Sequence, residues 1–216
     1  MYYLKPIFGM IKPSDIVLDL GCGVGRFTFR LAKLCKEVWG VDSSPAAIEF
    51  CKQYAQKFAV HNVKFQVADA RELPFSDETF DWVLSVTVLQ HIVHENDLID
   101  SIKEILRVTK KGGRIILLEC TTDKRKDNIT ISLPRKRWFE IIRHSGGEIE
   151  YWTGIDVSFL RRIIFPAINA TKKIKINKLR NFVELGLSYL LKPFEMTIPK
   201  IIKNQSWYSL ILIKKL

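Results

Sequence analysis

The chain of 216 residues has no apolar run as long as the roughly 18 residues that a membrane-spanning helix needs. It has only four cysteines and no C-x-x-C pair, which indicates reduced, mostly buried thiols and excludes a disulfide framework or a cysteine zinc site. Its first residues lack the charged-then-apolar layout of a signal peptide. We therefore expect a cytoplasmic protein, built as a single domain over residues 1–216.

Acidic residues are scarce in the last quarter of the chain, and the formal net charge of the whole is +11. Residues 1–156 carry 22 Lys and Arg against 21 Asp and Glu, whereas residues 157–216 carry 12 against two. A basic segment of this kind attracts nucleic acid, an anionic membrane surface or an anionic substrate, or it is the solvated face of a basic protein. Composition alone leaves these interpretations open.

Strand patterns and helical periods alternate along residues 16–119, which predicts an α/β fold with a parallel sheet and helices on both faces. Five strands are predicted first, at Ile16–Leu20, Glu37–Val41, Val63–Val67, Phe80–Ser85 and Arg114–Glu119. Two more follow, at Glu148–Trp152 and Trp207–Ile213, the last ended by Lys214 and Lys215. Helices are predicted at 26–34, from Pro45 with Ser43 or Ser44 as N-cap, at 97–109 with an end at Lys110–Gly113, and at 135–144.

The stretch Val17–Gly25, with the sequence VLDLGCGVG, is the most informative motif. A buried strand ends on Asp19, and a glycine-x-glycine-x-glycine turn then leads into a helix. Glycines at such a turn let the backbone approach a ligand closely. A carboxylate beside the turn repels pyrophosphate and suits a ligand with a positive charge. This contrast favours a sulfonium cofactor over a dinucleotide.

The order of elements, with acids at three strand ends, resembles the class I S-adenosylmethionine-dependent methyltransferases. The resemblance covers roughly residues 14–156 and the last strand, and it is closest to the small-molecule, methyltransferase type 11-like branch. It implies a Rossmann-like sheet of seven strands, mostly parallel, with the seventh antiparallel. It also implies S-adenosyl-L-methionine as cofactor. No single motif identifies this family, but the motifs together do. One of them is the turn, whose spacing is G-x-G-x-G rather than the G-x-G-x-x-G of dinucleotide-binding turns.

The resemblance also implies roles for the residues at the strand ends. Asp19 would lie near the methionine amine of the cofactor, and Gly21, Cys22 and Gly23 would bring backbone against methionine and ribose. Asp42, with Ser43 beside it, would accept both ribose hydroxyls. The Asp69 carboxylate would accept from the adenine amine, and the Ala70 N–H would face the adenine ring. The Val86 carbonyl would accept from the cofactor amine. Either Asp42 or Asp69 alone could instead cap a helix or start a turn.

His91 is the candidate general base, because in the family this segment lies over the transferred methyl. The alternative is that it packs or contacts the cofactor. His91, His94 and Glu95 do not have the H-E-x-x-H spacing, so no metal is expected. Tyr2 and Tyr3 could form an aromatic lid or a frayed terminus.

The sequence narrows the class of molecule that could accept the methyl group. Ser85–Val88 does not match the motif of DNA amine methyltransferases, and Cys120 lacks the context of a cytosine-C5 nucleophile. We expect methyl transfer to oxygen or nitrogen of a small or amphiphilic acceptor, with an anionic or lipid-linked one included. Alternatives are an RNA or protein methyltransferase, although stacking aromatics are sparse between Phe165 and Phe182, and a non-catalytic cofactor-binding module.

A basic and apolar helical insertion is predicted at about 157–206, where Pro166, Pro193 and Pro199 divide short helices. Seven basic residues and no acid lie between Asp156 and Glu184. Such a segment suits a lid over an anionic acceptor or peripheral contact with the inner membrane surface. A lid helix that packs on the domain is favoured slightly over membrane contact.

Overall fold

The computed structural model describes residues 4–122, 130, 131, 133–155 and 208–216. Its contacts divide the chain into a unit of residues 1–152 and 210–216 and a second unit of residues 153–209. Most of the second unit lies outside the described residues, including the predicted insertion at 157–206, and so do Tyr2 and Tyr3. The fold and the site are therefore built from the first unit. No helix within the described part of the chain is both long and apolar enough to cross a bilayer.

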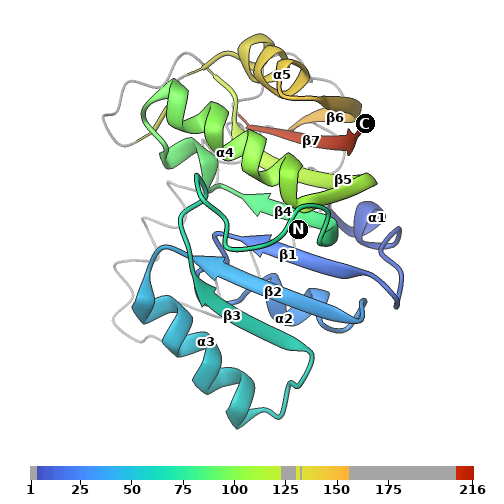
Figure 1. Cartoon of the computed structure of the whole chain (residues 1–216), viewed down its shortest axis with the longest axis vertical. Coiled ribbons are helices and arrows are strands. Elements are labelled where there is room, and N and C mark those ends of the chain that lie inside the picture. Colours follow the sequence, from blue (N-terminus) through green and yellow to red (C-terminus); the bar gives the residue numbers. More distant parts are fainter. Residues whose placement is uncertain (1–3, 123–129, 132, 156–207) are drawn as a thin grey trace, which may run out of the picture. The chain divides into compact units, whose positions relative to one another are not determined.

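The strands are β1 Ile16–Leu20, β2 Glu37–Asp42, β3 Val63–Val67, β4 Phe80–Val86, β5 Thr109–Cys120, β6 Gly147–Ile155 and β7 Tyr208–Lys215. They form one sheet in the order β3-β2-β1-β4-β5-β7-β6. Neighbours among β1 to β5 are parallel, and β7 runs antiparallel (Figure 1). This mixed sheet confirms the predicted Rossmann-like α/β fold. Its order reverses between β1 and β4, which is where open α/β sheets bind ligands.

The helices are α1 Lys5–Phe8, α2 Thr28–Leu31, α3 Pro45–Lys57, α4 Glu95–Val108 and α5 Arg135–His144, with a 3-10 turn at Leu89–His91. α2 and α3 contact each other through Phe29 and Tyr54, whose ring centroids are 4.6 Å apart. α4 and α5 are joined by an ion pair between Glu95 and Arg137. The helices thus form two pairs.

Side-chain alternation along β1 places these two pairs on opposite faces of the sheet. Leu18 and Leu20 are buried in one cluster with Ile102 of α4 and Ile141 of α5. Asp19 points to the other face, where its carboxylate accepts a hydrogen bond from Thr28 of α2. The predicted coverage of both faces is therefore confirmed, and Asp19 is the one polar side chain within an otherwise apolar buried strand.

Several predicted boundaries differ from the structure, and three of these differences have a physical reason or consequence. α2 is one turn long, flanked by turns such as the Phe29 N–H to Gly25 O bond, whereas a helix over 26–34 was expected. Lys110–Gly113 does not end α4, which stops at Val108; the glycines instead allow β5 to bulge out opposite Asp81. β7 continues through Lys214 and Lys215, and the Lys215 Nζ donates to the Thr109 carbonyl oxygen at 2.8 Å.

Candidate active site

A cavity of about 720 Å³ lies at the carboxyl ends of β1, β2 and β4. Every site residue predicted from the sequence lines it: Asp19, Gly21, Cys22, Gly23, Asp42, Ser43, Asp69, Ala70, Val86 and His91. The strand register explains this convergence, because Leu20 is paired with both Val41 and Ser85. The residues that follow each strand therefore leave the sheet at one edge. The structure brings the predicted residues together, and their roles toward a ligand stay predictions.

The glycine turn is shaped by two glycines with different surroundings. Gly21 has φ +66°, and a Cβ there would meet Val88 Cγ2 at 2.2 Å, so only glycine fits between the turn and the loop after β4. Gly23 has φ +53°, and a Cβ there would meet nothing within 4 Å. Gly21 thus serves packing, whereas the space beside the Cα of Gly23 is open. Cys22 is buried, and its Sγ lies 3.7 Å from the Gly23 carbonyl oxygen.

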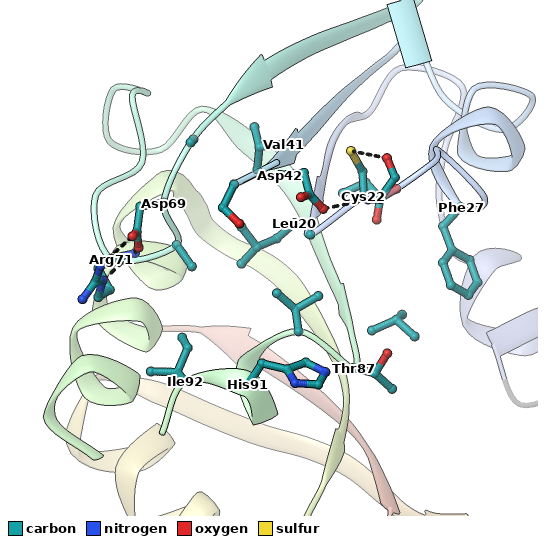
Figure 2. Close-up of a pocket in the computed structure, with 18 of the residues that line it drawn as sticks. Leu20, Cys22, Phe27, Val41, Asp42, Asp69, Arg71, Thr87, His91 and Ile92 are labelled. Carbon is teal, nitrogen blue, oxygen red and sulfur yellow. Dashed lines mark hydrogen bonds and ion pairs between the residues drawn. The ribbon is translucent and has the colours of Figure 1, made fainter. Parts of the chain in front are cut away.

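Asp42 is held by the backbone on both carboxylate oxygens. The Gly23 N–H donates to Oδ2 at 2.8 Å, and the Ser44 N–H donates to Oδ1 at 2.9 Å. Ser44 is the N-cap of α3, where its hydroxyl accepts from the Ala47 N–H. A carboxylate oxygen can accept two hydrogen bonds, so each oxygen of Asp42 keeps one open acceptor position. Figure 2 shows Asp42 beside the turn that carries Cys22.

Asp19 is almost completely buried, with 2% of its surface exposed, and the Thr28 hydroxyl donates to its Oδ2 at 2.5 Å. Burial raises the pKa of Asp19 to about 7, because a low-dielectric surrounding penalises the charged form; the Thr28 hydrogen bonds and the Arg26 charge partly oppose this. The carboxyl group therefore changes its charge near neutral pH. A cation placed in the cavity would favour the ionised form.

Asp69 and Arg71 form a close ion pair on the cavity wall (Figure 2). Arg71 Nη2 donates to Asp69 Oδ2 at 2.7 Å, and Arg71 Nε donates to Oδ1 at 3.0 Å. Hydrogen bonding to this guanidinium holds the pKa of Asp69 below its ordinary value. The carboxylate predicted to face adenine is thus already oriented by a neighbouring arginine, which the sequence analysis did not foresee.

The loop after β4 is fastened to a buried carboxylate. Glu119 on β5 is fully buried and accepts from the Ser85 hydroxyl and from the N–H groups of Val88, Leu89 and Gln90, at 3.0–3.2 Å. Thr87 in this loop has φ +58°, a strained conformation for a β-branched residue that costs about 1–3 kcal/mol. The hydrogen bonds to Glu119 offset that strain. They also fix the segment that carries His91.

His91 ends the 3-10 turn and is exposed on the cavity wall, with its Nε2 3.4 Å from Gln90 Nε2. Figure 2 shows His91 and Thr87 on the wall across from Asp42. This place suits a group that exchanges a proton with a bound acceptor. Among the described residues, no three His, Cys, Asp or Glu side chains converge as metal ligands would.

A sequence model of a methyltransferase domain matches residues 11–158, more than half of the chain. The chain belongs to this methyltransferase family. All residues that line the cavity fall within the matched region. The resemblance stated from the strand-end acids and the glycine turn is therefore confirmed.

Two curated relatives and one solved structure show how far the methyltransferase likeness extends. The chain is 34% identical to the uncharacterized methyltransferase YcgJ of Bacillus subtilis, over 51% of the chain and 44% of YcgJ. It is 35% identical to a demethylmenaquinone methyltransferase of Bacillus cereus, over 50% of the chain and 46% of that enzyme. The chain thus spans less than half the length of either relative. The structure of geranyl diphosphate methyltransferase in complex with SAM shares the fold, with a TM-score of 0.71, 16% identity, and coverage of 100% of this chain and 84% of that one.

Sequence reasoning missed two residues that line the cavity and one, Glu119, that supports its wall. Arg26 lines the cavity, with its guanidinium carbon 4.7 Å from the centroid of the Phe27 ring, and its position directly after the glycine turn was the available signal. Arg71, two residues after Asp69, carried a similar local signal. Glu119 carried none, because its partners lie 29–34 residues away in the sequence.

Proposed function

We propose that this chain is an S-adenosylmethionine-dependent methyltransferase that transfers a methyl group to oxygen or nitrogen of a small or amphiphilic acceptor. The observation that carries the proposal is Asp42, with one open acceptor position on each oxygen. Two vicinal ribose hydroxyls match this pair of positions. The open backbone at Gly23 and the carboxyl of Asp19 complete a surface for a nucleoside with a cationic tail.

The residues present fit the cofactor, and each would hold a different part of it. Asp42 would hold the ribose, Asp69 the adenine amine, and Asp19 the ammonium group, while Arg26 offers a cation to the carboxylate of the same methionine moiety. When bound, the cofactor supplies a methyl group already activated on a sulfonium. What the chain must add is alignment of the acceptor and removal of its proton. We assign proton removal to His91, whose ring lies on the cavity wall.

The acceptor side of the cavity supports an apolar or amphiphilic molecule. Beside His91, the lining includes the apolar side chains of Val88, Ile92 and Val93. Val24 and Val93 are 61% and 46% exposed, so apolar surface reaches the rim. A relative named demethylmenaquinone methyltransferase agrees with an acceptor of this kind. We further propose that residues 157–206 hold an anionic or lipid-linked acceptor. We also propose a cytoplasmic location with peripheral membrane contact.

Calorimetry and a turnover assay test the proposal together. We expect wild-type protein to bind S-adenosylmethionine and S-adenosylhomocysteine and to show no heat with NADH. Radiolabelled methyl transfer is then measured over phenols, quinols, amines, lipid extracts, RNA and protein. Label in RNA or protein alone would favour the alternative acceptors, and binding without any turnover would favour a non-catalytic module. His91→Ala should lower turnover with unchanged cofactor affinity, whereas His61→Ala, outside the cavity, should change neither.

Cofactor binding should release a proton near neutral pH. The pKa of Asp19 is raised to about 7 in the free protein, and a bound ammonium group lowers it, because opposite charges favour ionisation. Below that pKa, affinity should rise with pH by up to about tenfold per unit, and it should level off above it. Calorimetry in buffers of different ionisation enthalpy measures the released proton. Asp19→Asn should abolish the release, and a release that persists in this variant would contradict the assignment.

A further inference from the structure

Arg71 spans two elements on the cavity wall. Its guanidinium binds the Asp69 carboxylate, just after β3, through Nε and Nη2, and its Nη1 donates to Asp97 Oδ2 at 3.1 Å. Asp97 lies in the first turn of α4. All three side chains line the cavity. Asp69 is therefore tied through Arg71 to a helix on the other side of the site.

A count of hydrogen bonds shows what this arrangement leaves open on Asp69. Oδ1 accepts from the Arg71 N–H at 2.8 Å and from Arg71 Nε at 3.0 Å, which fills both of its acceptor positions. Oδ2 accepts only from Arg71 Nη2 at 2.7 Å. One acceptor position remains, on one oxygen. Asp42 differs, because backbone donors leave one position on each of its oxygens.

The single open position matters because both partners are at the surface. The side chains of Asp69 and Arg71 are 48% and 50% exposed, and without the guanidinium only the Arg71 backbone N–H would hold the Asp69 carboxylate, through Oδ1, so that Oδ2 could turn toward solvent. A planar guanidinium that binds side-on fixes the carboxylate plane, which an ammonium group does not. Arg71 thus determines which way the remaining acceptor faces.

We propose that Arg71 is a positioning residue that aims the one open acceptor of Asp69 at the exocyclic amine of adenine, and so makes the site selective for an amino-purine over an oxo-purine. An amine donates to that acceptor. A carbonyl at the same place brings lone pairs of two oxygens together and leaves the open acceptor position of Asp69 without a donor, which disfavours binding. This inference rests on the proposed function, since it concerns how the same cavity holds the cofactor.

A comparison of two nucleosides isolates the effect of Arg71 on the amine. Dissociation constants are measured by calorimetry for S-adenosylhomocysteine and for its deaminated analogue S-inosylhomocysteine. Wild type should prefer the adenosyl compound by tenfold or more. Arg71→Ala should weaken binding of the adenosyl compound by roughly five- to twentyfold, because one charge-assisted hydrogen bond to the amine is lost. It should leave the dissociation constant of the inosyl compound within about twofold of wild type. Arg71→Lys should resemble Arg71→Ala, because it keeps the charge and loses the planar fork.

The matched control is Arg114→Ala, because Arg114 makes the same side-on pair with Glu150 outside this cavity. It should change neither constant. Asp97→Asn should reduce the preference by a smaller factor than Arg71→Ala. The inference would be overturned if Arg71→Ala weakened binding of both nucleosides equally or of neither. Tighter binding of the adenosyl compound by this variant would also overturn it. If wild type binds neither nucleoside, the proposed function fails first; if it binds them with no preference, only this inference fails.

Discussion

Replacement of Asp42 by alanine is expected to weaken S-adenosylmethionine binding by at least about 100-fold, because two hydrogen bonds to a carboxylate are lost at roughly 1.5–3 kcal/mol each. The same substitution releases the N–H groups of Gly23 and Ser44, which the carboxylate now accepts. The glycine turn and the start of α3 would then lose a shared anchor. Calorimetry well below the unfolding temperature measures the effect on binding alone.

Two further variants separate the acceptor role of Asp42 from its structural role. Asp42→Asn keeps one accepting oxygen and places an NH₂ group against a backbone N–H, so an intermediate loss of roughly tenfold is expected. Asp100→Ala removes an exposed acid that pairs with Lys103 outside the cavity, and it should leave affinity unchanged. Affinity of Asp42→Ala within threefold of wild type would show that the ribose is held elsewhere.

Replacement of Glu119 by alanine should destabilise the fold by about 3–5 kcal/mol, because it leaves buried donors without an acceptor. Glu119 accepts from three successive backbone N–H groups and from the Ser85 hydroxyl. Few single side chains in the described part of the chain serve as many buried donors. Urea unfolding monitored by circular dichroism gives the free energy, and Glu148→Ala, at an exposed position of β6, is the control.

The pH dependence of the Glu119 effect has a definite sign. Burial raises the pKa of Glu119 from 4.5 to about 7, so the folded state holds a proton that the unfolded state releases between these values. Stability from this group is therefore present below pH 4.5 and lost as pH rises toward 7. Because glutamine does not titrate, the unfolding free energies of wild type and Glu119→Gln should converge from pH 5 to pH 8. A gap that widens with pH would contradict the assignment.

The sequence predicted the central part of this fold well, because β1 is a short apolar strand that ends at a glycine turn and β2 ends beside Ser44, the N-cap of α3. The gathering of Asp19, Asp42 and Asp69 could also be predicted, since carboxyl ends of parallel strands meet at one edge. The bulge opposite Asp81 could not, because it depends on pairing between β4 and β5. Nor could the Glu119 contacts, since no local pattern links a carboxylate to a loop about 30 residues away.

The side-chain geometry of Asp69 lay beyond sequence reasoning for a different reason. Arg71, two residues after Asp69, was visible in the sequence, but its additional bond to Asp97 of α4 was not, because Asp97 is 26 residues away. Long-range contacts of this kind decide how many acceptors a predicted ligand residue still offers. The sequence could therefore identify Asp69 as a ligand residue without showing how many hydrogen-bond acceptor positions it still offers.

The contact between Gly21 and Val88 has a consequence for how the acceptor specificity of the proposed methyltransferase could change. The glycine turn touches the loop after β4 too closely for even one added methyl group, and that loop is bonded to Glu119. The glycine turn and the loop after β4 therefore form one rigid part of the cavity wall, where the proposed cofactor would bind. Room for new acceptors is therefore expected at the rim beyond these two segments, where the Val93 side chain is exposed. Diversification of the acceptor can proceed there while the nucleoside half stays constant.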